Sequence, residues 1–286
     1  SKQAQLGATR LLIEEHVQFN VCDADGDIPD GTALLLPGGQ PLPLDVVAAV
    51  RGLAESGRPL IAFGNHVRGL EELVLSAAAV ETDLSGQYIT LDRLVSDHII
   101  GPMPIALYRR ALTFDPQLET EVLANALPPL FDETLPENYH RYGPVDPRAQ
   151  GRPLILARKN IILCGAPLPE LIHAEGAWAI FLAMRQLFAR LIEHPMVQTN
   201  AGPTVEVALH RKKNDLVVHF VSSRMPRPGT APVRMRSFEP ILGIQVSLRA
   251  GGFPADVYRL KNREQIQWEF QDEGLILDVD LFEPHE

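Results

Sequence analysis

Residues 59–66 of the chain read PLIAFGNH, a short apolar run that ends in a glycine. An uninterrupted apolar run of this length is typical of a β-strand covered on both faces, as in a parallel sheet. A similar run, ALLLPGG, occupies residues 33–39, and residues 44–55 between the two runs carry apolar side chains at helical spacing. Strand, helix and strand in this order predict a doubly wound α/β domain.

The same alternation extends to both sides of this core. A helix predicted over residues 6–16 opens the chain, whereas domains of this kind normally open on a strand that leads into that helix. We therefore expect the first strand to lie upstream of Ser1, in a longer polypeptide. Residues 158–160 fit a hairpin turn. The remaining predicted elements of this part are helices at 70–79 and 175–193 and strands at 19–22, 88–91, 105–114, 153–157 and 161–164.

The pattern changes after residue 203 to short strands with alternating apolar residues. Residues 205–209 and 216–221 flank a polar turn and predict a hairpin. Regular strand spacing predicts an antiparallel β-sandwich. Almost all of the net charge of −10 lies before residue 200. We therefore predict an α/β domain over residues 1–197 and a β-sandwich over residues 204–286, with a linker between them. The later strands are expected at 244–248, 256–260, 265–270 and 275–279.

Composition excludes several classes of protein. The 286 residues are 45% hydrophobic and carry a net charge of −10, whereas a nucleic-acid-binding protein needs a basic surface. No apolar run reaches the roughly 20 residues that span a bilayer. The two cysteines, Cys22 and Cys164, lie in apolar segments and are expected to be buried, reduced thiols. The sequence therefore predicts a cytoplasmic protein that binds neither nucleic acid nor membrane.

The end of the run at 59–64 is the sharpest candidate for chemistry. A strand that ends in a tight turn before a helix displays one side chain above the sheet, as in a nucleophile elbow. In glutamine amidotransferase-like folds a cysteine holds that position, whereas this chain has Asn65 beside His66. An amide cannot act as an activated nucleophile. We therefore expect a structural turn, with Asn65 and His66 as the residues of a degenerate catalytic site.

Other motifs give weaker signals. The glycine loop at residues 36–40 lacks the spacing of a phosphate-binding loop. Asp23, Asp25 and Asp27 alternate as in a calcium loop, but Leu34 stands where the bidentate glutamate is required. No histidine or cysteine spacing suggests zinc, so we predict no metal and no cofactor. Residues 139–144 gather aromatic and polar groups in a proline-rich segment, which indicates either a binding loop or a loop packed on the sheet edge.

Two sets of segments carry a family resemblance. Residues 191–197, 203–211 and 216–221 resemble the C-terminal regions of bacterial proteins that pair a glycosidase-like (β/α)8 barrel with a beta-galactosidase trimerisation-type domain and a terminal sandwich. Residues 33–37 and 57–62 are similar to that trimerisation-type domain, which is itself glutamine amidotransferase-like and flavodoxin-like.

The chain departs from this family at two places. Gly57-Arg58 stands in place of a pair of glycines, and the sandwich hairpin ends on Ser222-Ser223 where an asparagine is usual. The resemblance implies that the catalytic carboxylates lie in the barrel, outside these residues.

Three functions follow from this reading. The first is a non-catalytic accessory and oligomerisation region of a glycoside-hydrolase-like protein. The second is a stand-alone amidotransferase-like enzyme that acts on an amide or a sugar. The third is a carbohydrate-binding module, with Tyr258, Trp268 and Phe270 as an aromatic platform.

A homo-oligomer, either a dimer or a trimer, is the expected assembly. Its contact would be formed by the helical face of the α/β domain or by residues 115–150. That irregular segment is more apolar than a solvated loop requires, through Leu130, Phe131, Tyr139 and Tyr142.

Overall fold

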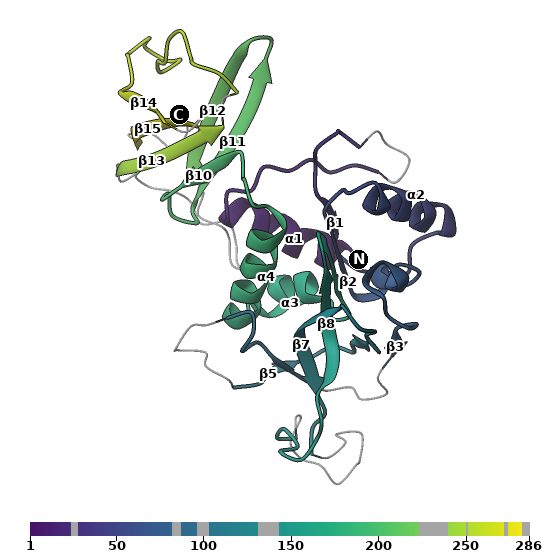
Figure 1. Ribbon diagram of the computed structural model, residues 1–286. Helices are drawn as coiled ribbons and strands as arrows, with labels where there is room; N and C mark the ends of the chain where they lie inside the picture. The colour runs from purple at the N-terminus through teal and green to yellow at the C-terminus, as the bar shows by residue number, and fades with distance from the viewer. Residues whose placement is uncertain are drawn as a thin grey trace. The chain divides into compact units, whose positions relative to one another are not determined.

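The computed structural model describes residues 1–23, 28–81, 87–95, 103–130, 143–222, 240–249, 251–271 and 274–281. The chain forms two compact units, and Figure 1 shows the elements of each. The first unit comprises Ser1–Leu11 and Val21–Glu193, and the second comprises Leu12–Asn20 and His194–Glu286. The domain bounds 1–197 and 204–286 stay a prediction, because compactness within the whole chain does not show that either part folds alone.

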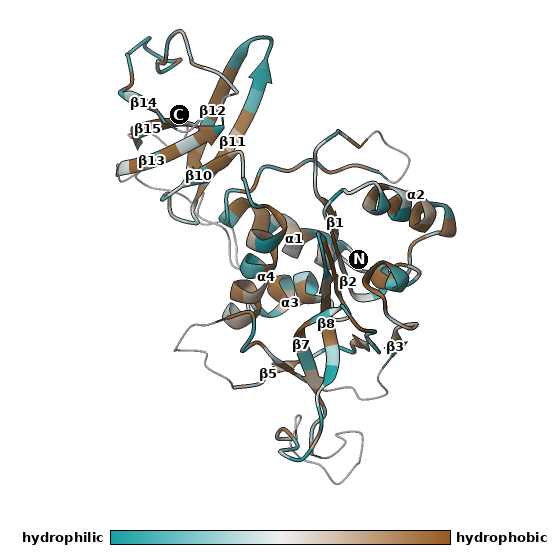
Figure 2. Ribbon diagram, in the orientation of Figure 1, coloured by the Kyte–Doolittle hydropathy of each residue, from teal (hydrophilic) through white to brown (hydrophobic). Residues whose placement is uncertain are grey.

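A seven-stranded sheet organises the first unit. Its first three strands are parallel and its other pairs are antiparallel, so the predicted α/β domain is confirmed as a mixed sheet. The parallel strands are the apolar runs at one end of the sheet, and every residue of β2 and β9 is buried. Figure 2 shows the hydrophobic character of β1 and β2. The strand order is β1 (Leu34–Leu36), β2 (Leu60–Phe63), β9 (Ile161–Cys164), β8 (Arg152–Arg158), β7 (Glu121–Leu127), β4 (Gln87–Thr90) and β5 (Ile105–Leu107).

Helices lie on both faces of this sheet. Helix α2 (Leu44–Glu55) buries Val47 and Val50 in one core with Leu60 and Ala62, which face the same way from β2. Figure 1 shows α1 (Lys2–Glu14), α3 (Leu168–Glu175) and α4 (Trp178–Leu191) on the opposite side. No helix in the described part of the chain is long and apolar enough to cross a membrane.

Four predicted elements of the first unit differ from the structure. The predicted helix at 175–193 is confirmed as α4 but begins only at Trp178, because Gly176 adopts a left-handed φ of 62° and ends the preceding helix α3. The predicted helix at 70–79 is only the 3-10 turn η2 (Glu71–Val74), since Leu75 is also left-handed. The predicted strand at 19–22 is wrong, as those residues form no ladder. Residues 105–114 divide into β5 and β6 (Leu112–Thr113), and β6 pairs with β3 (Val80–Glu81).

The second unit is antiparallel throughout its described strands. The predicted hairpin is confirmed as β11 (Val205–Lys212) and β12 (Asp215–Ser222). Both strands share one apolar core with a four-stranded sheet. The predicted strand at 256–260 is reduced to a single bridge, and the predicted linker begins with a strand. The order of the four-stranded sheet is β10 (Val197–Thr199), β13 (Ile241–Arg249), β15 (Gly274–Leu281) and β14 (Trp268–Gln271).

Residues 12–20 are attached to this hairpin by one side chain. The amide nitrogen of Gln18 donates to the Val207 carbonyl at 2.7 Å, and its oxygen accepts from the Leu209 N–H at 2.8 Å. The ring of His16 lies 3.0 Å from the Ala201 carbonyl. These contacts connect the segment that follows α1 with the second unit.

Candidate functional site

The loops that follow three parallel strands meet at one edge of the seven-stranded sheet. Gly39 after β1, Gly64 and Asn65 after β2, and Gly165 after β9 line a cavity of about 130 Å³. Ligands of open α/β sheets bind outside the carboxyl ends of the parallel strands. This cavity is therefore the candidate functional site of the first unit.

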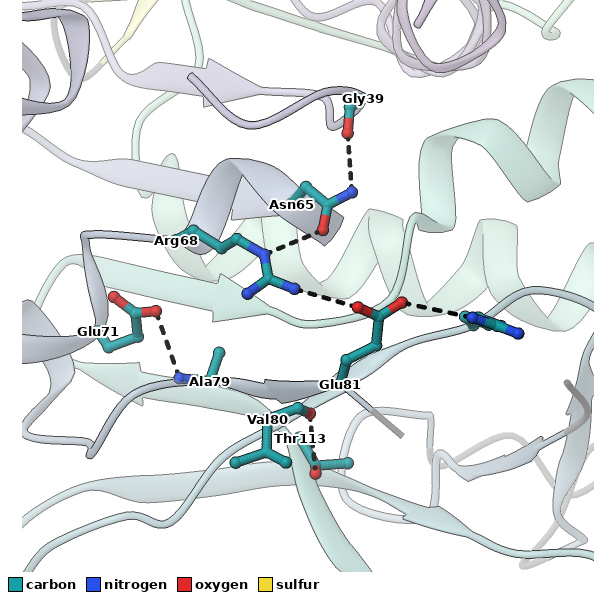
Figure 3. Close-up of polar contacts among 9 residues, drawn as sticks. Gly39, Asn65, Arg68, Glu71, Ala79, Val80, Glu81 and Thr113 are labelled. Carbon is teal, nitrogen blue, oxygen red and sulfur yellow. Dashed lines mark hydrogen bonds and ion pairs between the residues drawn. The ribbon is translucent and has the colours of Figure 1, made fainter. Parts of the chain in front are cut away.

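Asn65 stands at the predicted elbow and lines the cavity. Strand β2 ends at Phe63, and Gly64 has a φ of 54° that opens the 3-10 turn η1 (Gly64–Val67). The Asn65 amide nitrogen donates to the Gly39 carbonyl at 3.1 Å, and its oxygen accepts from Arg68 Nε at 3.3 Å, as Figure 3 shows. The side chain therefore joins the loops after β1 and β2.

His66 faces the loop after β1 and is not among the residues that line the cavity. Its Nδ1 accepts the Gly38 N–H at 3.1 Å, which places the ring proton of the neutral form on Nε2. Burial lowers the pKa of His66, and the positive charge of the Ser1 amino group acts in the same direction. The ring is therefore neutral at pH 7. A catalytic role for Asn65 or His66 stays untested.

Glu81 lies between two arginines at the rim of the cavity. One of its carboxylate oxygens is 3.4 Å from Arg68 Nη2, and the other is 3.9 Å from Arg110 Nη1. Figure 3 shows the row that runs from Asn65 through Arg68 to Glu81. All three charged side chains are substantially exposed, so these pairs contribute roughly 0–1 kcal/mol each to stability. These ion pairs place one carboxylate and two guanidinium groups beside the cavity.

Hydrogen bonds from Thr113 and Glu71 hold the segment that carries Glu81. The Thr113 hydroxyl lies 3.4 Å from the Val80 carbonyl, across the β3–β6 pair. The Glu71 carboxylate accepts the Ala79 N–H at 3.3 Å and the Gly69 N–H at 2.7 Å. Figure 3 shows the Thr113 and Ala79 contacts. The backbone is therefore anchored at the two residues that precede Glu81.

A second carboxylate lines the cavity from α3. Glu170 lies 3.1 Å from Arg109 Nε through one oxygen, and the Ser1 hydroxyl lies 3.3 Å from the other. Arg109 also approaches Glu175 at 3.9 Å. Partial burial raises the pKa of Glu175, and Arg109 opposes that rise. Glu81 and Glu170 thus reach one cavity from separate elements, and each is paired with an arginine.

The glycine after β9 allows the closest backbone approach at this site. The Leu112 N–H donates to the Gly165 carbonyl at 2.9 Å. A Cβ atom on Gly165 would lie 1.8 Å from the Leu112 carbonyl oxygen. Only glycine fits there, and this contact brings β6 and the adjoining arginines against the sheet.

The same arrangement of elements occurs in solved glycoside hydrolases. Alpha-L-fucosidase isoenzyme 2 from Paenibacillus thiaminolyticus superimposes with a TM-score of 0.82 at 18% identity, over 99% of this chain and 44% of that chain. The chain folds as a segment of glycoside-hydrolase chains does. The beta-galactosidase from Bacillus circulans sp. alkalophilus gives a TM-score of 0.58 at 13% identity, over 96% of this chain and 37% of that chain.

These likenesses show the fold alone. A GH42 beta-galactosidase from G. stearothermophilus gives a TM-score of 0.55 at 11% identity, over 98% of this chain and 36% of that chain. The chain therefore spans less than half the length of each of these solved proteins. Comparison with protein-family models and with curated protein sequences found no match.

The predicted aromatic platform of the second unit has a different form in the structure. Trp268 and Phe270 are partly buried and pack against its core. Phe253, which the sequence analysis missed, is 72% exposed and lies over them, with ring centroids 5.1 Å from Trp268 and 5.4 Å from Phe270. Arg263 covers the ring of Tyr258 at 4.8 Å. Only Phe253 of these residues presents most of its ring surface to solvent.

Several sequence candidates fall outside the described residues. These are Asp25 and Asp27 of the aspartate series and residues 139–142 of the aromatic loop. The described end of that loop contacts the sheet, since the Tyr88 hydroxyl donates to the Gly143 carbonyl at 2.6 Å. Within the described ranges, no three histidine, cysteine or acidic side chains gather as metal ligands would.

Glu81, Arg110 and Glu170 were missed at the level of sequence. They come from a two-residue strand, a loop and a short helix, and no motif spacing connects them. The only available signal was the position of Asn65, because whatever follows a buried parallel strand lies at the carboxyl edge of the sheet.

Proposed function

We propose that this chain is a non-catalytic accessory and oligomerisation region of a carbohydrate-active, glycoside-hydrolase-like protein. The observation that carries the proposal is the match of 99% of the chain to 44% of an alpha-L-fucosidase at a TM-score of 0.82. A segment of that relative size leaves room for a separate catalytic domain in the same polypeptide. The amidotransferase-like, trimerisation-type assignment of the first unit belongs to this proposal, supported by the mixed α/β sheet.

The chemistry of the elbow supports a non-catalytic role. Asn65 holds the position where a nucleophile would stand, and both ends of its amide are hydrogen-bonded. The thiol at the end of β9 does not replace it, because burial raises the pKa of Cys164 to about 12. A protonated thiol inside the sheet is a poor nucleophile. The catalytic groups of the parent protein are then supplied from outside these residues.

An exposed aromatic side chain supports the oligomerisation role. Trp178 begins α4, is 63% exposed, and stacks on Phe181 with ring centroids 5.5 Å apart. Tryptophan is enriched at protein interfaces because it buries a large area with few rotatable bonds. Leu130, in the apolar segment named from the sequence, is exposed as well, while Phe131 lies outside the described residues. A symmetric dimer or trimer through the α4 face is the assembly that we propose.

Light scattering of the purified 286-residue chain tests the assembly. The chain is expected to be a dimer or trimer at tens of micromolar, and Trp178→Glu is expected to dissociate it without unfolding it. Leu44→Glu, at an exposed site in the first turn of α2, is the matched control and keeps the oligomer. Dissociation by Leu130→Glu alone would move the contact to that segment. A strict monomer would overturn the oligomerisation role.

Turnover assays test the non-catalytic part of the proposal. The isolated chain is expected to hydrolyse neither aryl α-L-fucosides, aryl β-D-galactosides nor glutamine analogues. Turnover that disappears in His66→Ala would instead support the amidotransferase-like enzyme.

The carbohydrate-binding module remains the second candidate, because one observation favours it. Phe253 presents an exposed ring on the second unit, supported edge-on by Trp268 and Phe270. Exposed aromatic rings can stack on the apolar faces of sugars. Retardation in affinity electrophoresis through a soluble polysaccharide, abolished in Phe253→Ala, is the result this candidate requires. Equal mobility of the two proteins would exclude this ring as a platform.

A further inference from the structure

The cavity at the carboxyl edge of the sheet combines three kinds of surface. Glu81 and Glu170 offer carboxylate oxygens, and Arg110 offers guanidinium N–H groups. The backbone of Gly39, Gly64 and Gly165 lies between them, and Leu112 and Pro167 add apolar surface. All of these residues belong to the first unit. Acceptors, donors and an apolar wall therefore converge in a volume of about 130 Å³.

The charged groups of this cavity are paired with one another and still have hydrogen-bonding capacity for a ligand. Arg68 and Arg110 flank Glu81, and Arg109 contacts Glu170, so each carboxylate has an arginine partner. An ionised carboxylate accepts about four hydrogen bonds, which leaves each of them with acceptor capacity. Arg110 approaches Glu81 at 3.9 Å through one nitrogen, and a guanidinium has five N–H donors. The cavity can thus both donate and accept.

These charges select against ions of either sign. A carboxylate or phosphate ligand would lie against Glu81 and Glu170, and a cation would lie against Arg110 with Arg68 and Arg109 behind it. Neighbouring hydroxyl groups can donate to a carboxylate and accept from a guanidinium at the same time. The C–H face of a sugar ring also suits the apolar wall. A neutral polyhydroxylated molecule is therefore the ligand that fits this lining.

We propose that this cavity is a non-catalytic monosaccharide-binding site. It holds one edge of the sugar, with two neighbouring hydroxyls hydrogen-bonded to Glu81 and Arg110 from the cavity side. The small volume and the close wall of Gly64 and Pro167 exclude the interior of an oligosaccharide. The site is preformed, because the Asn65–Gly39 hydrogen bond fixes two of its loops.

The ligand class follows from the cavity, whereas L-fucose and D-galactose as first probes rest on the proposed function. D-mannose is added so that failure of the proposed binding site can be told apart from failure of the proposed function. Binding of D-mannose alone supports the site and counts against a fucosidase or galactosidase parent. Acetate tests the selection against anions.

Titration of the 286-residue chain, followed by amide chemical shifts, is the experiment. At least one monosaccharide is expected to bind saturably with a Kd on the order of 1 mM, the range for a ligand of this size. Glu81→Gln is expected to weaken binding about tenfold, because hydrogen bonds to a charged group are lost. Glu121→Gln is the matched control: Glu121 is also 52% exposed and paired with an arginine, Arg190, but lies outside the cavity.

Arg110→Ala is the second variant, since that side chain is 65% exposed and its removal leaves the core intact. It is expected to weaken binding as Glu81→Gln does. Equal effects of Glu81→Gln and Glu121→Gln would overturn the site, as would tighter binding of acetate than of any sugar. If Phe253→Ala lost sugar binding while Glu81→Gln bound as tightly as the parent chain, the site would be overturned in favour of the aromatic site on the second unit. Absence of saturable binding by all three sugars would also overturn it.

Discussion

Two glycines of the first unit differ in whether a side chain would fit in their place. Gly165 has no room for a side chain, because a Cβ atom would stand 1.8 Å from the Leu112 carbonyl oxygen. Gly52, in α2, has no atom within 4 Å of that position. The same substitution therefore probes backbone packing at the cavity in one case and helix propensity in the other.

Gly165→Ala is expected to lower the free energy of unfolding by at least about 2 kcal/mol, since the backbone must shift to relieve the overlap. Gly52→Ala is expected to raise it by about 0.5–1 kcal/mol, because alanine is the better residue inside a helix. Urea denaturation of both variants against the parent chain measures the two effects. A tolerated Gly165→Ala would show that β6 is not held against β9.

His66 makes the stability of the first unit depend on pH. Burial lowers its pKa in the folded chain below the ordinary value of 6.5, so the unfolded chain binds more protons between those two values. Its contribution is fully present above about pH 6.5 and is lost as the pH falls through 6.5 toward the folded value.

The pH effect is isolated by His66→Asn, whose amide oxygen can accept the Gly38 N–H and does not titrate. The parent chain is expected to lose more unfolding free energy than His66→Asn between pH 7.5 and pH 5.5. Denaturant unfolding at both pH values gives the comparison. Parallel changes in the two proteins would show that the ring is equally protonated when folded and unfolded.

Among the elements, buried strands were the most predictable part of the chain. The runs that form β2, β9 and the middle of β8 are apolar because both faces of the sheet are covered there. Element ends were less predictable. The periodicity of 175–193 runs through Gly176, and only its left-handed φ shows that one helix ends there and another begins. The cavity was predictable only at Asn65, since Glu81 and Arg110 reach it through tertiary folding alone.

The Gln18 side chain hydrogen-bonds two backbone groups of β11 that point away from β12. Gln18→Ala is expected to cost about 1–2 kcal/mol, because both the Val207 carbonyl and the Leu209 N–H lose their partner. Hydrogen exchange offers a sharper measurement: the Leu209 amide is expected to lose protection, while the amide of His219, which forms a hydrogen-bonded pair with Ala208 in the hairpin, keeps it. Unchanged exchange at Leu209 would place the 12–20 segment elsewhere.

At the scale of the whole molecule, the second unit is assembled from two separate parts of the chain. Residues 12–20 and His194–Glu286 belong to it, and β10 buries Val197 in its core before residue 204 is reached. The predicted domain at 204–286 therefore lacks one edge strand and the segment bound by Gln18.

A fragment of residues 204–286 is expected to melt about 10 °C below a fragment of residues 194–286. Burying a valine contributes about 1.5–3 kcal/mol, and 1 kcal/mol corresponds to about 4–8 °C in a unit of this size. Circular dichroism melts of the two fragments give the difference. Identical melting temperatures would support 204–286 as the natural domain.

The two cysteines differ in accessibility, so the number of thiol labels that the chain takes up depends on whether it is folded. Cys164 is buried in β9 as predicted, with its pKa raised to about 12, whereas the prediction of a buried thiol is wrong for Cys22, which is exposed because it lies outside any strand. A maleimide dye is expected to add once to the native chain and twice after denaturation, as mass spectrometry can count. Cys22 can therefore carry a fluorophore that reports oligomer formation by self-quenching. The proposed assembly can then be tested at nanomolar concentration without any engineered residue.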